Sequence, residues 1–431
     1  MKKVITKIKI FICILALSLF ILLYNVYYEF LIINDMSNWN SRTFNINRFF
    51  QKRTLFRPGA PAKKKLPDIK YVLMWTNPNN EPLVELENGH TRFIKSLCPY
   101  INCYVTSDRY FLEDYTQFDV VLFAGSDLIG DDLDLPDRRS DVQKYVFASV
   151  ESSENYPLCS KRFNNYFNWT WTFRLDSESR WGYITIRNKK NKAIIGPKKV
   201  MHWMKLNKMT PVSKKFKKDL SSKTKAAAWF PSQCHTKARG ENFVSQLKRE
   251  LKAYKLSIDT YGHCGNLKCL NEECEKIIKK DYYFYLAFEN SFDTDYVTEN
   301  LLLGLRNNAV PIVFGGANYT SFMPDGIYLN ARKLGAKKLA RKMNELIKSP
   351  NKYAEYFKWT NHYIYKMNNE SIITDNYCNM CKLINNKKKM KAKSVYKNFR
   401  DWWNQPNACR SYDKQISNKL RLSNKPKSIS F

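Results

Sequence analysis

A short stretch in the second half of the chain carries polar side chains that could bind a ligand together. They are Glu289, Asn290, Tyr296, Glu299 and Asn300. Tyr296, Glu299 and Asn300 are spaced i, i+3 and i+4, so a helix over this stretch would present all three on one face. Glu289 is open to two interpretations, because it either faces a ligand or stabilises the end of the strand before it.

The elements around these side chains predict where they meet. Residues 282–288 form an aromatic, apolar run that predicts a buried strand, and residues 309–314 predict a second strand that ends at two glycines. Residues 297–307 predict a helix between them, with Thr294 or Asp295 as its cap. This order of elements favours a parallel sheet, in which ligands bind beyond the carboxyl ends of the strands and helix N-termini attract anions.

Residues 284–316 closely resemble the donor-site motif of the α1,3-fucosyltransferases, which usually reads FYLAFENS-x-x-x-DY-x-TEK-x-x-x-x-L-x-x-x-x-VPVV-x-G. This chain matches FYLAFENS, DYVTE and VPIVFG in order and spacing. Asn300 stands where the family has a Lys that helps to hold the nucleotide diphosphate. The resemblance implies that Asn290, Tyr296, Glu299 and Asn300 contribute to the donor site.

Two further blocks are similar to the family and imply roles in the reaction. Residues 143–152 resemble its W-x-W-x-x-x-ES segment, and this match implies that Glu151 is the general base. Residues 230–265 resemble its SNC block, in which an Arg holds the diphosphate. Arg239 stands one residue before that position, at a predicted helix start, where the guanidinium and the helix N-terminus would act together.

The resemblance also implies a fold and a reaction. The expected fold is α/β of the GT-B type, with two Rossmann-like domains and a cleft between them. The expected reaction transfers L-fucose from GDP-β-L-fucose to the 3-hydroxyl of a GlcNAc residue, with inversion and without a metal cofactor. Two D-x-D patterns, at 132–134 and 293–295, are too short to indicate a metal site by themselves. Asn300 leaves the alternative of a catalytically weak or inactive protein that binds glycan or nucleotide.

The beginning of the chain predicts a membrane anchor. Residues 1–9 are basic, residues 10–33 are largely apolar and long enough to span a bilayer, and residues 34–67 form a polar, basic stem. Lysines before the span favour a cytoplasmic N-terminus. We therefore expect a single-pass type II protein of the Golgi membrane, with its catalytic part in the lumen.

Three segments follow the expected stem. Residues 68–225 would form the acceptor-side domain, residues 226–375 the domain that binds GDP-fucose, and residues 376–431 a C-terminal segment with a C-x-x-C motif and a basic tail. The Lys-rich residues 189–225 are either a solvated loop or a basic rim of the acceptor cleft.

The charge of the chain admits two explanations. Lys and Arg total 72 against 39 Asp and Glu, which gives a formal net charge of +33. Such an excess is typical of nucleic-acid-binding proteins, but it also suits a solvated basic surface. Because a lumenal location argues against nucleic acid, we expect GDP-fucose, a GlcNAc-containing glycan and the membrane as partners.

Cysteines and N-x-[ST] sequons both fit a lumenal protein. Eleven Cys occur, and Cys13 lies in the expected anchor, which leaves an even number for disulfide bonds. The candidates for disulfide bonding are Cys98, Cys103, Cys234, Cys264, Cys378 and Cys381. In the family the C-terminal C-x-x-C pair tends to be linked to the N-terminal domain, which implies Cys98 and Cys103 as its partners. The candidate glycosylation sites are Asn168, Asn318 and Asn369, of which Asn318 follows the predicted donor strand closely.

Overall fold

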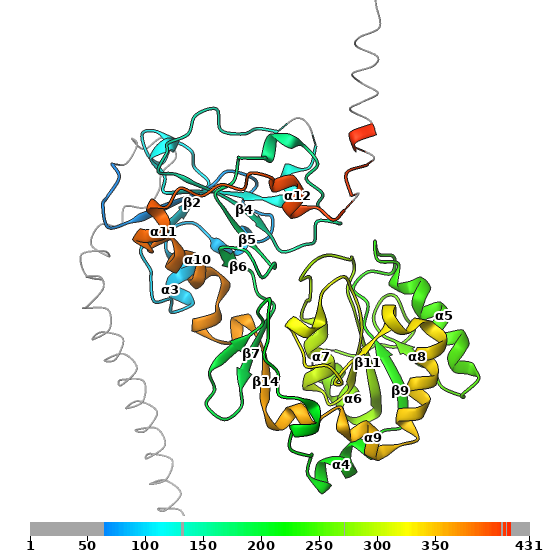
Figure 1. Cartoon of the computed structure of the whole chain (residues 1–431). Coiled ribbons are helices and arrows are strands. Elements are labelled where there is room, and N and C mark those ends of the chain that lie inside the picture. Colours follow the sequence, from blue (N-terminus) through cyan, green and yellow to red (C-terminus); the bar gives the residue numbers. More distant parts are fainter. Residues whose placement is uncertain (1–63, 131–132, 271, 407, 411, 415–431) are drawn as a thin grey trace, which may run out of the picture. The chain divides into compact units, whose positions relative to one another are not determined.

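A computed structural model describes most of the chain (Figure 1). The described residues are 64–130, 133–270, 272–406, 408–410 and 412–414. The expected anchor at 10–33 and nearly all of the expected stem at 34–67 lie outside these ranges. Within them, no helix is both long and apolar enough to cross a bilayer.

Six parallel strands form the first sheet, in the order β2-β1-β3-β4-β5-β6. They are β1 Lys70–Met74, β2 Cys103–Thr106, β3 Val120–Ala124, β4 Lys144–Ser149, β5 Trp169–Thr172 and β6 Ser179–Arg180, and the short helix α3 Thr91–Lys95 precedes β2. Both faces of this sheet are covered, so its strands are apolar on both sides. In β1, for example, Val72 and Met74 pack into one core, whereas Tyr71 and Leu73 pack into the other.

Five parallel strands form the second sheet, in the order β10-β9-β11-β12-β13. They are β9 Lys225–Trp229, β10 Ile258–Thr260, β11 Tyr282–Phe288, β12 Val310–Phe314 and β13 Leu329–Asn330. The central strand β11 coincides with the run predicted at 282–288. Its side chains alternate between two cores, with Phe284 and Leu286 in one and Tyr285 and Ala287 in the other. The expectation of an α/β fold with parallel sheets is confirmed.

Helices cover both faces of the second sheet (Figure 1). They are α4 Lys214–Ser221, α5 Gly240–Lys252, α6 Glu272–Asp281, α7 Asn300–Arg306, α8 Ala331–Ile347 and α9 Pro350–Glu355. The helices α5 and α8 pack against each other, and apolar residues of both enter the core that contains Phe284. The short helix α7 contacts β11 and β12 on the other face, as expected for the connection in a β-α-β unit.

The helix α7 begins later than the sequence predicts. It starts at Asn300 with Glu299 as its N-cap, and neither Thr294 nor Asp295 caps it. Asp295 adopts a left-handed conformation, with φ of 62°, and its carboxylate accepts a hydrogen bond from a backbone N–H that follows β5. Tyr296 therefore precedes the helix, and the prediction that one helical face presents it with Glu299 and Asn300 is wrong.

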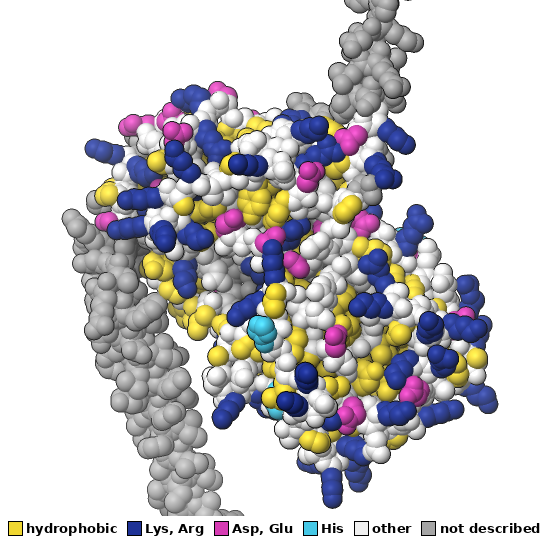
Figure 2. Space-filling view, viewed as in Figure 1, with side chains coloured by type: hydrophobic (Ala, Val, Ile, Leu, Met, Phe, Trp, Pro, Cys, Tyr) yellow, Lys and Arg dark blue, Asp and Glu magenta, His cyan; other side chains and the backbone are white. Residues whose placement is uncertain are grey.

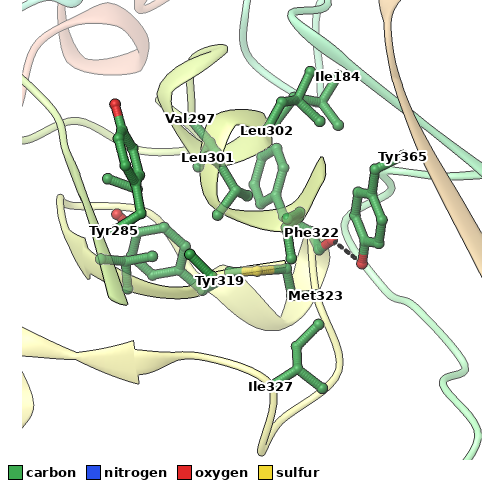
Figure 3. Close-up of a cluster of buried hydrophobic side chains, with 14 of the residues drawn as sticks. Ile184, Tyr285, Val297, Leu301, Leu302, Tyr319, Phe322, Met323, Ile327 and Tyr365 are labelled. Carbon is green, nitrogen blue, oxygen red and sulfur yellow. Dashed lines mark hydrogen bonds between the residues drawn. The ribbon is translucent and has the colours of Figure 1, made fainter. Parts of the chain in front are cut away.

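A small antiparallel sheet has the strand order β14-β7-β8. Two of its strands precede the second sheet in the sequence, and the third follows it. Its strands are β7 Ile184–Asn188, β8 Ile194–Gly196 and β14 Tyr363–Met367. Figure 3 shows Ile184 of β7 and Tyr365 of β14 beside the core under α7. The Tyr365 hydroxyl donates to the Phe322 carbonyl at 3.0 Å. The small sheet thus shares a core with the second sheet.

The C-terminal segment returns to the first sheet. Its helices are α10 Asn376–Ile384, α11 Lys387–Lys391 and α12 Phe399–Trp403. Tyr377 and Met380 of α10 pack into one core of the first sheet, and Phe399 and Trp403 of α12 pack into the other. The two faces of the first sheet are therefore completed by residues from the far end of the chain.

Disulfide bonds hold this return in place and confirm the expectation of disulfide bonding. The five pairs among the described residues are Cys98–Cys378, Cys103–Cys381, Cys159–Cys409, Cys234–Cys264 and Cys269–Cys274. The first two join the C-x-x-C motif of α10 to cysteines beside and within the first sheet, the link that the resemblance implied.

Candidate active site

A cavity of about 410 Å³ is lined by residues that follow strands of both parallel sheets. The loop after β4 and the loop after β11 touch beside it. The Oγ atoms of Ser152 and Ser291 are 2.6 Å apart, and the backbone N–H of Ser153 donates to Asp293 Oδ2 at 2.6 Å. These groups are buried, so the two bonds fix the loops to each other.

Glu151 follows β4 and lines the cavity. Its Oε2 accepts hydrogen bonds from Asn155 Nδ2 at 2.7 Å, from the Tyr296 hydroxyl at 3.0 Å and from Asn290 Nδ2 at 3.4 Å. No donor to its Oε1 is recorded in the described part of the chain. The three donors hold the carboxylate in one orientation, and Oε1 is available to accept a proton from a bound molecule.

Glu289 ends β11 and has a different environment. Its side chain is only 3% exposed, and its two oxygens accept bonds from the Thr298 backbone N–H at 3.0 Å and the Thr298 hydroxyl at 2.9 Å. Burial raises the pKa of Glu289 to about 8, although the bonds from Thr298 oppose the rise. These contacts tie the end of the strand to the segment before α7, which favours a structural role for Glu289.

Three of the predicted donor-site residues surround Glu151. Asn290 and Tyr296 contact its carboxylate directly, and Glu299 lines the same cavity. Burial raises the pKa of Tyr296 well above its ordinary value, so its hydroxyl keeps its proton and serves as a donor. Enclosure by the cavity walls raises the pKa of Glu299, and the charges of Glu151 and Glu81 add to this rise.

The remaining two predicted donor-site residues differ in position. Asn300 lines the cavity, and its Nδ2 is 3.5 Å from the Phe288 carbonyl oxygen. Arg239 is the N-cap of α5, as the predicted helix start requires, but its side chain is exposed and does not line the cavity. Its neighbours Thr236 and Gly240 do line it.

Sequence reasoning missed a wall of the cavity that comes from distant segments. Its residues are Glu81, Glu85, Arg92, Trp181, Asp375 and Tyr377, which we call the acceptor wall. Glu81 and Glu85 lie in the connection between β1 and α3, farther from the strand end than Glu151 is from β4. A connection that leaves the carboxyl end of a parallel strand is a common source of site residues, and this was a usable signal. Asp375 and Tyr377 belong to the start of α10, and nothing local in their sequence pointed to the cavity.

The D-x-D carboxylates at 293–295 are engaged by the protein. Asp293 accepts bonds from the backbone N–H groups of Ser153 and Thr294, both at 2.6 Å, and from Gln405 Nε2. Burial raises the pKa of Asp293. In the other pattern, Asp134 pairs with Arg109 at 2.6 Å.

The three sequons lie in different environments. Asn168 is half-buried, with Nδ2 donating to the Ser394 carbonyl at 2.7 Å. Asn318 is exposed and does not line the cavity, whereas Asn369 is exposed and does. The Lys-rich residues 189–225 contribute no residue to the cavity lining.

Comparison with known proteins places the chain in a family. Residues 67–184 match the family model "Fucosyltransferase, N-terminal", and residues 220–402 match "Glycosyltransferase family 10 (fucosyltransferase) C-term". Alpha-(1,3)-fucosyltransferase C of Drosophila melanogaster is 30% identical over 333 residues, which cover 75% of this chain and 73% of that protein. Glycoprotein 3-alpha-L-fucosyltransferase A of the same species is 28% identical over 338 residues, which cover 75% of this chain and 59% of that protein.

A crystal structure of an α1,3-fucosyltransferase with GDP-fucose is similar to this structure with a TM-score of 0.44 and 15% identity. The match covers 80% of this chain and 95% of that one. On the two family models and the 30% identical relative, the chain belongs to glycosyltransferase family 10, the fucosyltransferases, and is a glycosyltransferase.

Proposed function

We propose that this chain transfers L-fucose from GDP-β-L-fucose to the 3-hydroxyl of a GlcNAc residue on glycoprotein or glycolipid glycans. The transfer would invert the anomeric configuration and need no metal ion. The names of the two relatives support the α1,3 linkage. The two parallel sheets would be the Rossmann-like domains of a GT-B fold, with the cavity as the cleft between them.

The observation that carries the proposal is the geometry of Glu151. Its Oε2 is held by three donors, which leaves Oε1 to act as the general base. In the proposed step Oε1 takes the proton of the acceptor hydroxyl while the hydroxyl oxygen forms a bond to C1 of fucose. The bond between C1 and the diphosphate oxygen breaks with its electron pair, and GDP leaves. Attack from the side opposite the leaving group produces inversion.

The donor would lie against the second sheet. Asn290, Tyr296 and Glu299 would form hydrogen bonds with it on one side, and Glu299 would face the positive charge that develops on the sugar. The start of α5, where Thr236 and Gly240 line the cavity, would face the diphosphate with the positive end of its helix dipole. Arg239 would add its guanidinium from the edge of this site.

We also propose that the protein resides in the Golgi membrane as a single-pass type II protein, anchored by residues 10–33. The five disulfide bonds support an oxidising compartment for the catalytic part.

A second candidate function is a catalytically weak or inactive protein that binds nucleotide or glycan. Asn300 favours it, because this residue lines the cavity where the motif has a Lys. In addition, Arg92 on the acceptor wall is the single Lys or Arg among the described residues that line the cavity. Stabilisation of the leaving diphosphate would then depend on Arg239 and the start of α5.

The test is a transfer assay on the full-length chain with GDP-fucose and a panel of GlcNAc-containing acceptors, with and without EDTA. We expect EDTA-resistant transfer. Glu151→Gln should lower kcat by roughly 10²-fold or more, because the amide cannot accept the proton. Glu87→Gln is the matched control, since Glu87 pairs with Lys95 on the surface and does not line the cavity.

The outcomes separate the two candidates. Transfer that is abolished by EDTA, or that survives in Glu151→Gln, contradicts the proposed mechanism. GDP binding without transfer to any acceptor favours the second candidate. In that case Asn300→Lys should strengthen GDP binding and raise transfer if the missing cation is the cause.

A further inference from the structure

The cavity has the opposite charge to the rest of the chain. Lys and Arg outnumber Asp and Glu by 72 to 39 overall. Yet the described residues that line the cavity include six carboxylates and a single guanidinium, that of Arg92. The carboxylates are Glu81, Glu85, Glu151, Glu289, Glu299 and Asp375. Figure 2 shows Lys and Arg side chains spread over the outer surface, including the region of α5 and α8.

The negative charge is concentrated away from the donor motif. Glu289 has a pKa of about 8 and is largely protonated at neutral pH. Of the other five carboxylates, Glu299 belongs to the donor motif and Glu151 lies at the proposed reaction centre. The remaining three, Glu81, Glu85 and Asp375, belong to the acceptor wall. An acceptor glycan that reaches Glu151 past this wall would meet three carboxylates on the way.

Arg92 offsets only part of this charge, because its one guanidinium is shared by two of the three carboxylates. Its guanidinium lies 3.3 Å from Glu85 Oε2 and 3.6 Å from Asp375 Oδ2. It also stacks on the Tyr377 ring, 4.0 Å from the centroid. The side chain of Arg92 is 22% exposed, so these three partners enclose most of it.

Glu81 acts across the cavity. It is exposed on the acceptor wall, and no ion pair is recorded for it within the described residues. Its charge raises the pKa of Glu299, after the larger effect of enclosure and together with Glu151. Glu81 and Glu299 line the same cavity, so the acceptor wall and the proposed donor site face one space. Trp181 and Tyr377 add aromatic surface between the carboxylates, which suits the apolar faces of sugar rings.

We propose that the acceptor wall makes this enzyme select uncharged acceptor glycans and reject acceptors that carry a carboxylate or sulfate near the reacting hydroxyl. This inference rests on the proposed fucosyl transfer to a glycan. Bringing like charges next to one another across a binding surface is unfavourable, and such repulsion is a common basis of specificity.

The experiment compares acceptors that differ in charge but not in shape. The full-length chain is assayed with N-acetyllactosamine, with its sialylated form and with the methyl ester of the sialylated form, which has the same bulk without the charge. We expect kcat/KM for the sialylated acceptor to be at least about tenfold below that for its methyl ester. Added salt should narrow this difference, because it screens the repulsion.

The variant Glu81→Gln/Glu85→Gln tests whether the wall is the cause. It removes two charges with little change in shape and leaves Arg92 paired with Asp375. We expect it to narrow the difference between sialylated acceptor and ester by at least about threefold, whereas Glu87→Gln, outside the cavity, should not. Two results would overturn the proposal. One is an equal kcat/KM of the parent enzyme for the sialylated acceptor and its methyl ester. The other is a ratio of these two values that is the same in the double variant as in the parent.

Failure of the proposed function would be recognised separately. If no acceptor is fucosylated, the same comparison is made by measuring binding of N-acetyllactosamine, the sialylated form and its ester to the GDP-bound protein. Weaker binding of the sialylated form than of its ester would show that the wall discriminates against charged glycans even in a protein that does not transfer fucose. Equal binding would overturn it.

Discussion

Glu151 and Glu289 show how two carboxylates of one site can acquire different properties. Glu151 accepts three hydrogen bonds through Oε2 at the edge of the cavity. Glu289 is buried, and its pKa of about 8 means that it keeps its proton at neutral pH. Such a separation of environments is how active sites distinguish a group that exchanges protons from one that supports the structure.

The raised pKa of Glu289 predicts a pH dependence of stability. The folded chain holds a proton on Glu289 up to about pH 8, whereas the unfolded chain releases it near about pH 4.3. This contribution to stability is therefore present at low pH and is lost as the pH rises towards 8. In Glu289→Gln the amide oxygen can still accept from the Thr298 backbone N–H, and the amide NH2 can donate to the Thr298 hydroxyl oxygen in place of the second bond. The variant removes the titration, so its stability should fall less between about pH 5 and about pH 9.

Denaturant unfolding of the parent and the variant at several pH values measures this difference. The free energy of unfolding of the parent should decline relative to Glu289→Gln by as much as about 1.4 kcal/mol per pH unit within that interval. Glu87→Gln, at an exposed position, should keep the slope of the parent. Parallel pH profiles for the parent and Glu289→Gln would show that Glu289 does not hold the proton.

Among the structural elements, α10 links the covalent framework to the cavity. Asp375 and Tyr377, at its N-terminal end, belong to the acceptor wall. Cys378 and Cys381 form disulfide bonds with Cys98 and Cys103, beside and within the first sheet. The Asp375 carboxylate also caps the helix, accepting from the backbone N–H groups of Tyr377 and Cys378. The position of the acceptor wall therefore depends on the two disulfide bonds that hold α10.

The two disulfides of α10 should contribute to stability in a non-additive way. Cys98–Cys378 and Cys103–Cys381 close almost the same long loop. While either bond remains, the other closes only the few residues between neighbouring cysteines, so removing one should cost about 2–3 kcal/mol. Removing both frees a much longer loop, and the loss should exceed the sum of the single losses by about 2 kcal/mol.

Paired Cys→Ser variants and denaturant unfolding provide the measurement. The comparison needs each single-bridge variant, the variant without both bridges, and a control that lacks Cys269–Cys274, which spans 5 residues. Additive losses would mean that the two bridges do not share a loop in the unfolded state.

Element by element, the local sequence predicted some features and missed others for identifiable reasons. The strand β11 was predicted because both of its faces are buried, which produces an unbroken apolar run. The start of α7 was missed because Asp295, a good capping residue, adopts a left-handed conformation instead. The pairing of β7 with β14 was also missed, because it joins segments that are far apart in the sequence and carries no local signal.

At the scale of the whole molecule, charge is segregated between surface and cavity. The motif located the residues around Glu151, but the acceptor wall depends on tertiary contacts of α10 with α3 and β6 that no single stretch reveals. The excess of Lys and Arg was expected to be a solvated surface, and the exposed basic residues of α5 and α8 fit this. They are Lys248, Arg249, Lys252, Arg332, Lys333, Lys337, Lys338 and Arg341.

This segregation predicts that a polyanion binds the protein without blocking its reaction. Heparin should bind at low salt and be released as salt increases, because it would contact the outer helices. Lys337→Glu/Lys338→Glu should weaken heparin binding and leave kcat/KM for a neutral acceptor within about twofold, since neither residue lines the cavity. Elution from a heparin column and steady-state kinetics measure the two effects. Heparin inhibition that competes with the acceptor would contradict the prediction.

The return of the C-terminal segment has a consequence for biosynthesis. A ribosome completes Cys98 and Cys103 long before their partners, which follow 280 and 278 residues later. At about 5–20 residues per second, these thiols must wait on the order of tens of seconds for α10 to emerge. Throughout that delay the first sheet lacks α10 and α12, which cover its cores, whereas all strands of the second sheet have been synthesised before α10. The part of the enzyme that is translated first is thus the part that is finished last.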